Sequence, residues 1–265
     1  MYLTLPDVRS LATTNPSTTA FMELREREAA QAGKSSRHYQ RWVPYSRISQ
    51  NLKRAVLVAE DDAFWQHEGV DMEQLRISIQ SDIEGGKAVR GGSTITQQLA
   101  KNLYLSPSRD PVRKLGELIL ARRLEAALSK ARIFEIYLNV IEWGDGIWGA
   151  DAAARTYFGS SAASLTPEQA AILAGAIINP RVYSPARPNA RLLGRQRIIL
   201  SRMGAYTPPA ATPVPVPQPE SVPPPEPASE ADTAEPEQPL QPPPAADTPP
   251  PVEETPRPTA EPARD

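Results

Sequence analysis

Cysteine is absent from the 265-residue chain, which excludes disulfide bonds, zinc–thiolate centres and thiol nucleophiles. Histidine occurs only twice, and aromatic residues make up only 6% of the chain. No apolar run approaches the roughly 18 residues that a membrane-spanning helix needs, and residues 1–11 are too polar for a signal peptide. The sequence as written therefore predicts a soluble chain, and a shortened gene start that had lost an N-terminal anchor would leave the same pattern.

Proline is unevenly distributed. Residues 206–265 hold 21 of the 30 prolines and no aromatic residue after Tyr206. Such a segment cannot bury enough apolar surface to offset its chain entropy, so we expect a disordered, partly polyproline-II tail. The segment has eleven acidic residues and two arginines, a net charge of −9, which leaves +7 on residues 1–205 of a chain whose total is −2. The remainder is therefore basic and suits an anionic partner.

The apolar pattern of residues 50–204 is mainly helical, and no stretch alternates convincingly as a strand. Leu52 and Val56 share one face of a helix that delivers Glu60 and Asp61 at its end. Further helices are expected to begin at Ser93 or Thr94, Pro111, Ser129, Thr166 and about residue 189. The sequence thus predicts a mainly α fold, with an N-terminal arm at 1–39, a folded domain at 40–205 and the tail at 206–265.

The segment AEDDAFWQHEGVD, residues 59–71, gathers acidic side chains around His67, Phe64 and Trp65. Close carboxylates repel one another, so this is either a solvated turn or a place where their proximity is useful. A metal site at Glu60, Asp61 and His67 lacks support from a second histidine or a cysteine. A serine triad that combines His67 with Ser93 has still less support, and the aromatic side chains are most simply core residues.

The segment EGGKAVRGGSTITQQ, residues 84–98, first suggests a phosphate-binding loop, but Gly92 occupies the position where a Walker loop needs lysine. A glycine-rich linker is the alternative. The helix that follows places Gln97, Gln98, Lys101 and Asn102 within two turns, which favours an anion site. In RKLGE, the four-residue spacing of an arginine and a glutamate would, taken alone, indicate an ion pair on a solvated helix face.

Taken together, EDDAFWQHEG, GGSTITQQLAKN, RKLGELILARRLE and KARIFEIYLN resemble the motifs of a known family. This family is the peptidoglycan glycosyltransferase domain that monofunctional biosynthetic transglycosylases share with the N-terminal half of class A penicillin-binding proteins. The resemblance covers about residues 40–204. A fifth motif appears as RQRIIL, which keeps Arg195 but departs at Gln196 and Ile199.

The resemblance implies a lysozyme-like, mainly helical domain with a small mobile subdomain that faces the membrane. It implies polymerisation of lipid II into β-1,4-linked glycan strands, with release of undecaprenyl pyrophosphate. Glu60 would be the base for the acceptor's 4-hydroxyl, and Glu117 would lie near the donor's anomeric carbon and pyrophosphate. Lys101, Arg113 and Lys114 would surround the leaving pyrophosphate. Residues expected to line the substrate cleft are Asp61, Phe64, His67, Ser93, Thr94, Gln97, Gln98 and Asn102.

A base that works near neutral pH needs a pKa above that of a free carboxylate, and we expect burial and the neighbouring Asp61 to raise that of Glu60. The resemblance requires no cofactor and admits a divalent cation, Mg²⁺ or Mn²⁺, that bridges the substrate pyrophosphate. It implies lipid II, the growing glycan strand, the membrane surface and cell-wall synthesis or division proteins as partners. It places the protein on the periplasmic face of the inner membrane, with the anchor not present in this chain.

Two other functions remain as alternatives. A lytic hydrolase of the same fold would use a lone glutamate to protonate a glycosidic oxygen, but it would not need three cations beside that glutamate. An inactive cell-wall scaffold would have no reason to keep both Glu60 and Glu117. Nucleic acid is not expected as a partner, because the basic residues fall inside the motifs instead of forming a stripe with exposed aromatics. No Ser-x-x-Lys motif follows residue 205, so transpeptidase activity is not expected.

Overall fold

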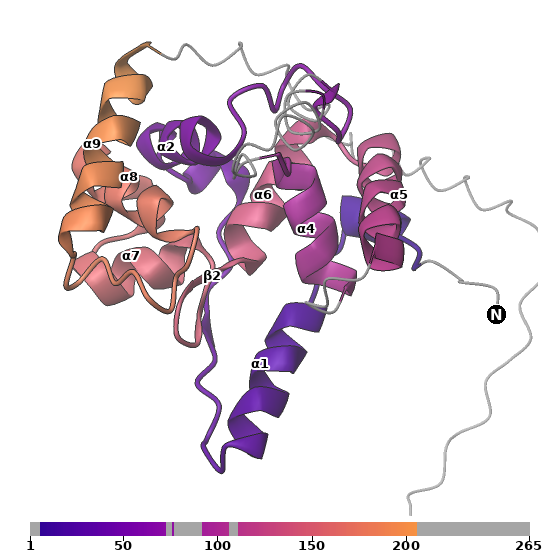
Figure 1. The fold of residues 1–265 in the computed structure, drawn as a ribbon, viewed down its shortest axis with the longest axis horizontal. Coiled ribbons are helices and arrows are strands. Elements are labelled where there is room, and N and C mark those ends of the chain that lie inside the picture. The colour runs from indigo at the N-terminus through magenta and orange to yellow at the C-terminus, as the bar shows by residue number, and fades with distance from the viewer. Residues whose placement is uncertain (1–5, 73–75, 77–91, 106–110, 206–265) are drawn as a thin grey trace, which may run out of the picture. The chain divides into compact units, whose positions relative to one another are not determined.

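The structure is a computed structural model that describes residues 6–72, 76, 92–105 and 111–205 (Figure 1). Internal contacts divide the chain into two units, Met1–Thr212 and Pro213–Asp265. Every described residue belongs to the first unit. The tail expected at 206–265 lies outside the described residues.

Helices dominate the described part of the chain, which confirms the mainly α fold class. The helices are α1 (Ala20–Gln31), α2 (Gln50–Glu60), α4 (Ile95–Tyr104), α5 (Pro111–Ala127), α6 (Lys130–Val140), α7 (Ala150–Phe158), α8 (Pro167–Ala176) and α9 (Ala190–Ala205). Short 3-10 turns lie at Arg9–Ala12, Tyr45–Arg47 and Ala162–Ser164. None of the helices in these residues is long and apolar enough to cross a membrane.

Side-chain caps fix where several helices begin. Thr94, Ser129 and Thr166 each accept a hydrogen bond from the backbone N–H three residues further on. Thr166 and Gln169 form a reciprocal capping box, which satisfies two backbone donors that a helix start leaves free. The predicted starts of α4, α6 and α8 are therefore confirmed, with Thr94 and not Ser93 as the cap of α4.

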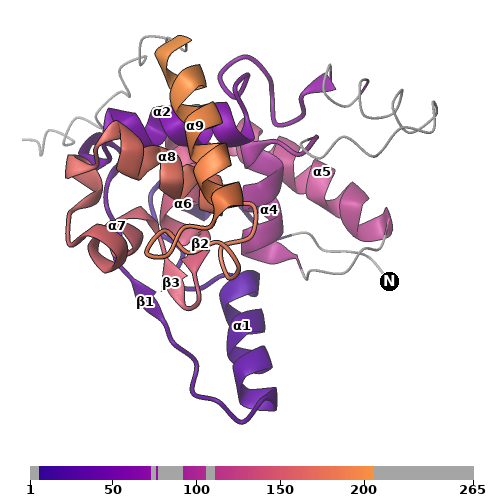
Figure 2. The same cartoon turned by 60° about the vertical axis from the view of Figure 1, so that its left-hand side comes forward.

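The helix that carries Glu60 is held in place by α8 and α9. Helix α8 is buried from residue 170 to 176, and α2 and α9 both pack against it (Figures 1 and 2). On α2, Leu52 and Val56 are fully buried, as predicted from their spacing. Full burial of an aliphatic side chain stabilises a fold by about 1.5–3 kcal/mol. The packing of α2 therefore holds its last residue, Glu60, in a fixed position.

A second group of helices surrounds α4, which packs against α1, α5 and α6. Ile95, Leu99 and Ala100 of α4 are fully buried. Helix α1 lies within the expected N-terminal arm, yet it packs on α4, and its Arg25 Nε lies 3.0 Å from a carboxylate oxygen of Glu142. The division of the chain at residue 39 stays a prediction.

The structure also contains a small sheet that the alternation pattern did not predict. Its strands are β1 (Tyr39–Gln40), β2 (Glu142–Gly144) and β3 (Ile147–Trp148), in the order β1-β3-β2. Strand β3 pairs in parallel with β1 and antiparallel with β2. Asn139, fully buried at the end of α6, exchanges hydrogen bonds with the backbone of Val43 at 2.8 and 2.9 Å, which fixes the segment before α2.

Candidate active site

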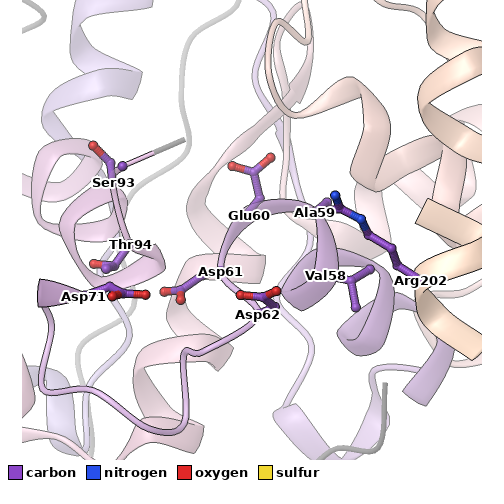
Figure 3. Close-up of a pocket in the computed structure, with 10 residues that line it drawn as sticks. Val58, Ala59, Glu60, Asp61, Asp62, Asp71, Ser93, Thr94 and Arg202 are labelled. Atoms are coloured by element: carbon purple, nitrogen blue, oxygen red, sulfur yellow. The ribbon is translucent and has the colours of Figure 1, made fainter. Parts of the chain in front are cut away.

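Glu60 is the last residue of α2 and lines a recess of about 210 Å³. Its carboxylate points into this recess, with Ser93 and Thr94 on one side and Arg202 of α9 on the other (Figure 3). Asp61, Asp62 and Asp71 also line it, so the recess is predominantly acidic. The acidic stretch singled out in the sequence is therefore part of a concave site and not only a solvated turn.

Asp61 anchors the end of α2. Its Oδ2 accepts a hydrogen bond from the backbone N–H of Ile95 at 2.9 Å, and its Oδ1 lies 3.0 Å from Nε2 of His67. Only 4% of the Asp61 side chain is exposed. The ring of His67 stands edge-on to that of Phe64, with centroids 6.3 Å apart. These contacts hold the residue next to Glu60 against the first turn of α4.

A chain of side-chain hydrogen bonds leads from the core to Glu60. The Tyr137 hydroxyl donates to Oε1 of Gln98 at 2.9 Å, and Nε2 of Gln98 donates to Oε2 of Glu60 at 2.9 Å. Burial raises the pKa of Glu60 above its ordinary value, although the Gln98 hydrogen bond and the charges of Arg195 and Lys101 oppose this. A carboxylate with a raised pKa in a recess is suited to accept a proton near neutral pH.

Two cations meet at Glu117, on α5. Arg113 Nη1 lies 3.0 Å from Oε2 of Glu117, and Lys114 Nζ contacts Oε1. Lys114 also donates to Ser93 Oγ at 3.2 Å and to Gln97 Oε1 at 3.3 Å, so it joins α5 to the start of α4. The ion pair predicted by the spacing is present, but the expected solvated face is wrong because only 5% of the Glu117 side chain is exposed.

Lys101 lies one turn beyond Gln98 on α4, and both line a second recess of about 240 Å³. Asn102 lines this recess too, and its side chain donates to the backbone carbonyl of Gln98 at 2.8 Å. Burial lowers the pKa of Lys101, and the nearby positive charges of Arg113 and Lys114 lower it further. The negative charge of Glu117 opposes this shift. The Glu60–Gln98 hydrogen bond thus links a residue that lines the first recess to one that lines the second.

Gly69 supports this arrangement, and sequence reasoning did not identify it. Its carbonyl accepts hydrogen bonds from Thr94 Oγ1 at 2.7 Å and from Gln97 Nε2 at 3.3 Å. Its φ of +82° favours glycine, and an added Cβ would lie 3.0 Å from Cγ of Glu125 and 3.2 Å from the carbonyl oxygen of Ala121. Glycine is therefore required here for both conformation and space.

Arg202 was also missed as a lining residue. It lies seven residues after Arg195 on α9, a spacing of about two helical turns that places both on one face. That spacing was the available signal in the sequence. Asp62 and Asp71 belong to the quoted acidic stretch but were not selected, because nothing local distinguishes them from other acidic residues in a turn.

The residues predicted for the site fall into connected groups. Those that line the first recess are Glu60, Asp61, Ser93 and Thr94. Those that line the second are Gln98, Lys101 and Asn102. A third group is joined by hydrogen bonds and ion pairs around two cations and consists of Gln97, Arg113, Lys114 and Glu117.

Phe64 and His67 are placed differently from the others. Phe64 is fully buried, with Lys130 Nζ 4.4 Å from its ring centroid. Only 9% of the His67 side chain is exposed, and His67 faces Asp61. Substrate contact by these two stays a prediction, and the geometry supports a structural role for both. In the part of the chain that the structure describes, no group of three or more histidine or acidic residues is arranged to hold a metal ion.

Comparison with known proteins gives consistent matches over the folded residues. A model of the transglycosylase family matches residues 25–204. The chain is 52% identical over 192 residues to a biosynthetic peptidoglycan transglycosylase of Dechloromonas aromatica (strain RCB), which covers 72% of this chain and 83% of the relative. A protein of the same name from Laribacter hongkongensis (strain HLHK9) is 49% identical over 189 residues, 71% of this chain and 83% of the relative. Another from Aromatoleum aromaticum is 51% identical over 191 residues, 71% of this chain and 82% of the relative.

Proposed function

Since this chain belongs to the transglycosylase family, we propose that it polymerises lipid II into β-1,4-linked glycan strands and releases undecaprenyl pyrophosphate. The observation that carries the proposal is a half-buried carboxylate, Glu60, whose pKa is raised by burial and which lies near the positive charges of Lys101 and Arg195. Lys101 in turn lies near the positive charges of Arg113 and Lys114. A proton acceptor and a site for a departing anion are the two things that this reaction needs from a protein.

Glu60 is the general base in this proposal. Gln98 donates a hydrogen bond to Oε2 of Glu60. We therefore propose that Oε1 accepts the proton of the acceptor's 4-hydroxyl. As that hydroxyl oxygen attacks the donor's anomeric carbon, its proton passes to Glu60 and the bond from the anomeric carbon to the phosphate oxygen breaks. The pyrophosphate leaves with the electron pair, and inversion of an α-linked donor produces a β linkage.

Lys101, Arg113 and Lys114 receive the departing charge. Cations already in place at a site where negative charge develops lower the barrier without reorganisation. Glu117 balances two of these cations in the substrate-free protein through its contacts with Arg113 and Lys114. The geometry supports Glu117 as the residue that holds these cations in place, and its contact with the donor's anomeric carbon stays a prediction.

Helix α5 also offers a surface for the membrane in which lipid II is anchored. Leu115 and Ile119 are 58% and 42% exposed and lie one turn apart, and Val112, three residues before Leu115, is 62% exposed. Arg122 and Arg123 follow on the same helix and are exposed. An exposed apolar row next to basic residues is typical of surfaces that bind anionic lipid.

The remaining parts of the proposal concern setting and partners. We place the protein on the periplasmic face of the inner membrane, with cell-wall synthesis or division proteins as partners and without transpeptidase activity. The described residues offer no dedicated metal site, so a Mg²⁺ or Mn²⁺ ion would be held mainly by the substrate pyrophosphate.

Glu60→Gln tests the proposal because it keeps the shape of the side chain but cannot accept a proton. Polymerisation of labelled lipid II, resolved on gels, should fall by about 10²-fold or more while lipid II still binds. Glu68→Gln is the matched control, since Glu68 is an exposed glutamate in the same segment. Near wild-type polymerisation by Glu60→Gln would contradict the role of Glu60. Release of fragments from preformed glycan by the wild type, without polymerisation, would favour a hydrolase instead.

A further inference from the structure

We infer that Tyr137 is a positioning residue for this reaction: its hydroxyl fixes the orientation of the Gln98 amide, so that Gln98 presents an N–H group to Glu60. The inference rests on the proposed role of Glu60 as the base. Tyr137 lies on α6, inside the core, and is linked to Glu60 by hydrogen bonds through Gln98.

The direction of each hydrogen bond follows from the chemistry of the three groups. An ionised carboxylate only accepts hydrogen bonds, so Gln98 must turn its NH₂ group towards Glu60. The amide oxygen of Gln98 then faces Tyr137, 2.9 Å from the hydroxyl oxygen, and needs a donor there. Tyr137 supplies this donor, and rotation of the amide by 180° would place two acceptors, the amide oxygen and the carboxylate, against each other.

Tyr137 retains its proton under all working conditions. It is fully buried, and burial raises its pKa well above the ordinary tyrosine value, with the negative charges of Glu60 and Asp61 adding to the shift. The hydroxyl therefore keeps a proton that it can donate to Gln98 while Glu60 is ionised.

Packing alone does not explain the choice of tyrosine. Phe134, one turn earlier on α6, is also fully buried, and its ring lies 6.4 Å from that of Tyr137, nearly parallel. The same core thus accommodates phenylalanine next to this position. What phenylalanine lacks at residue 137 is the hydroxyl that reaches Gln98.

Loss of the hydroxyl should raise the pKa of Glu60. Without its donor, Gln98 can rotate and bring its oxygen towards the carboxylate, which disfavours the ionised form. The other charged groups near Glu60 are Asp61, Asp62, Asp71 and Arg202, which line the same recess, together with Lys101 of α4 and Arg195 of α9. None of these is altered by Tyr137→Phe, so a change in the titration of Glu60 would be transmitted through Gln98.

The experiment measures polymerisation of lipid II against pH for wild type, Tyr137→Phe and Tyr157→Phe. Because the base must be ionised, the rate falls as pH falls through its pKa, and this acid limb of kcat/KM should move to higher pH by about 0.5 to 1 unit in Tyr137→Phe. The kcat at the wild-type optimum should fall about 3- to 10-fold, with KM little changed. Tyr157 is the matched control: its half-buried hydroxyl donates to the backbone carbonyl of Trp143 at 3.2 Å, away from Glu60.

A folded Tyr137→Phe variant with the wild-type acid limb would overturn the inference. Thermal unfolding establishes whether the variant is folded. If it is not, Gln98→Met tests the same link, since it removes the N–H group that reaches Glu60 while keeping the length of the side chain, and it should move the limb in the same direction. An unmoved limb in Gln98→Met would also overturn the inference, as would a further shift when Tyr137→Phe is added to Gln98→Met. Activity of Glu60→Gln would instead overturn the proposed base, so the two failures are distinguishable.

Discussion

The carboxylate of Asp61 accepts a hydrogen bond from the backbone N–H of Ile95 at 2.9 Å, and so joins the residue that follows α2 to the first residue of α4. Glu60 immediately precedes Asp61, and Gln98, its hydrogen-bond donor, lies on α4. This one contact therefore sets the distance between the proposed base and the helix that carries its partners.

Asp61→Ala should lower the free energy of unfolding by about 1–3 kcal/mol, because it leaves the buried N–H of Ile95 without its acceptor. Thermal and denaturant unfolding measure this change. Asp62→Ala is the control, since Asp62 is exposed and its loss should change stability by no more than about 0.5 kcal/mol. Equal stability of the two variants would contradict the anchoring role of Asp61.

Lys101→Ala should lower kcat for polymerisation by roughly 30- to 1000-fold. A cation contact that strengthens as the bond to pyrophosphate breaks contributes about 2–4 kcal/mol to the transition state. Lys34→Ala, which removes an exposed lysine after α1, serves as the control. Polymerisation that is unaffected by Lys101→Ala would refute the assignment of Lys101 to the leaving group.

The pH profile of kcat/KM should be narrower than ordinary glutamate and lysine pKa values would give. Glu60 must be ionised, and burial raises its pKa, so activity is lost at a higher pH on the acid side. Lys101 must be protonated, and burial lowers its pKa, so activity is lost at a lower pH on the alkaline side. Lys101→Arg should shift the alkaline limb to higher pH, because a guanidinium keeps its charge. An alkaline limb that stays in place would assign it to another group.

Leu115→Glu should weaken binding to vesicles that contain anionic lipid by about 10-fold or more, because it replaces an apolar side chain that would enter the bilayer surface with a charged one. Co-sedimentation measures the binding. Ile198→Glu is the matched control, as Ile198 is a 57% exposed apolar residue on a different helix, α9. Equal loss in both variants would show that charge alone, and not the α5 surface, determines binding.

Local chemistry made much of the fold predictable. The spacing of Leu52 and Val56 and the capping residues Thr94, Ser129 and Thr166 identified four helices, because caps and apolar faces act over a few residues. Helix α7 was missed, since its sequence ADAAARTYF is rich in alanine and gives little apolar contrast. The β2–β3 hairpin was missed because its strands are too short to alternate, although Asp145 and Gly146 between them are a recognised turn signal.

The candidate site was predictable in its residue types but not in its connections. The two-turn spacing of Gln97, Gln98, Lys101 and Asn102 on α4 is local and was visible. The Tyr137–Gln98 contact spans 39 residues and the Lys114–Ser93 contact spans 21, and neither follows from any periodicity. The burial of the Glu117 ion pair was likewise hidden, because it depends on how α5 packs against α4.

The two recesses linked by the Glu60–Gln98 hydrogen bond differ in charge, and this difference bears on the charges that an inhibitor should carry. The recess that Glu60 lines contains three further carboxylates and one cation, Arg202. The second recess contains Lys101, and its other two charged residues, Arg25 and Glu142, form an ion pair with each other. A plain polyanion that imitates pyrophosphate would be attracted by Lys101 but repelled by the acidic recess. A molecule that spans both would therefore need an uncharged or cationic end for Glu60 and an anionic end for Lys101.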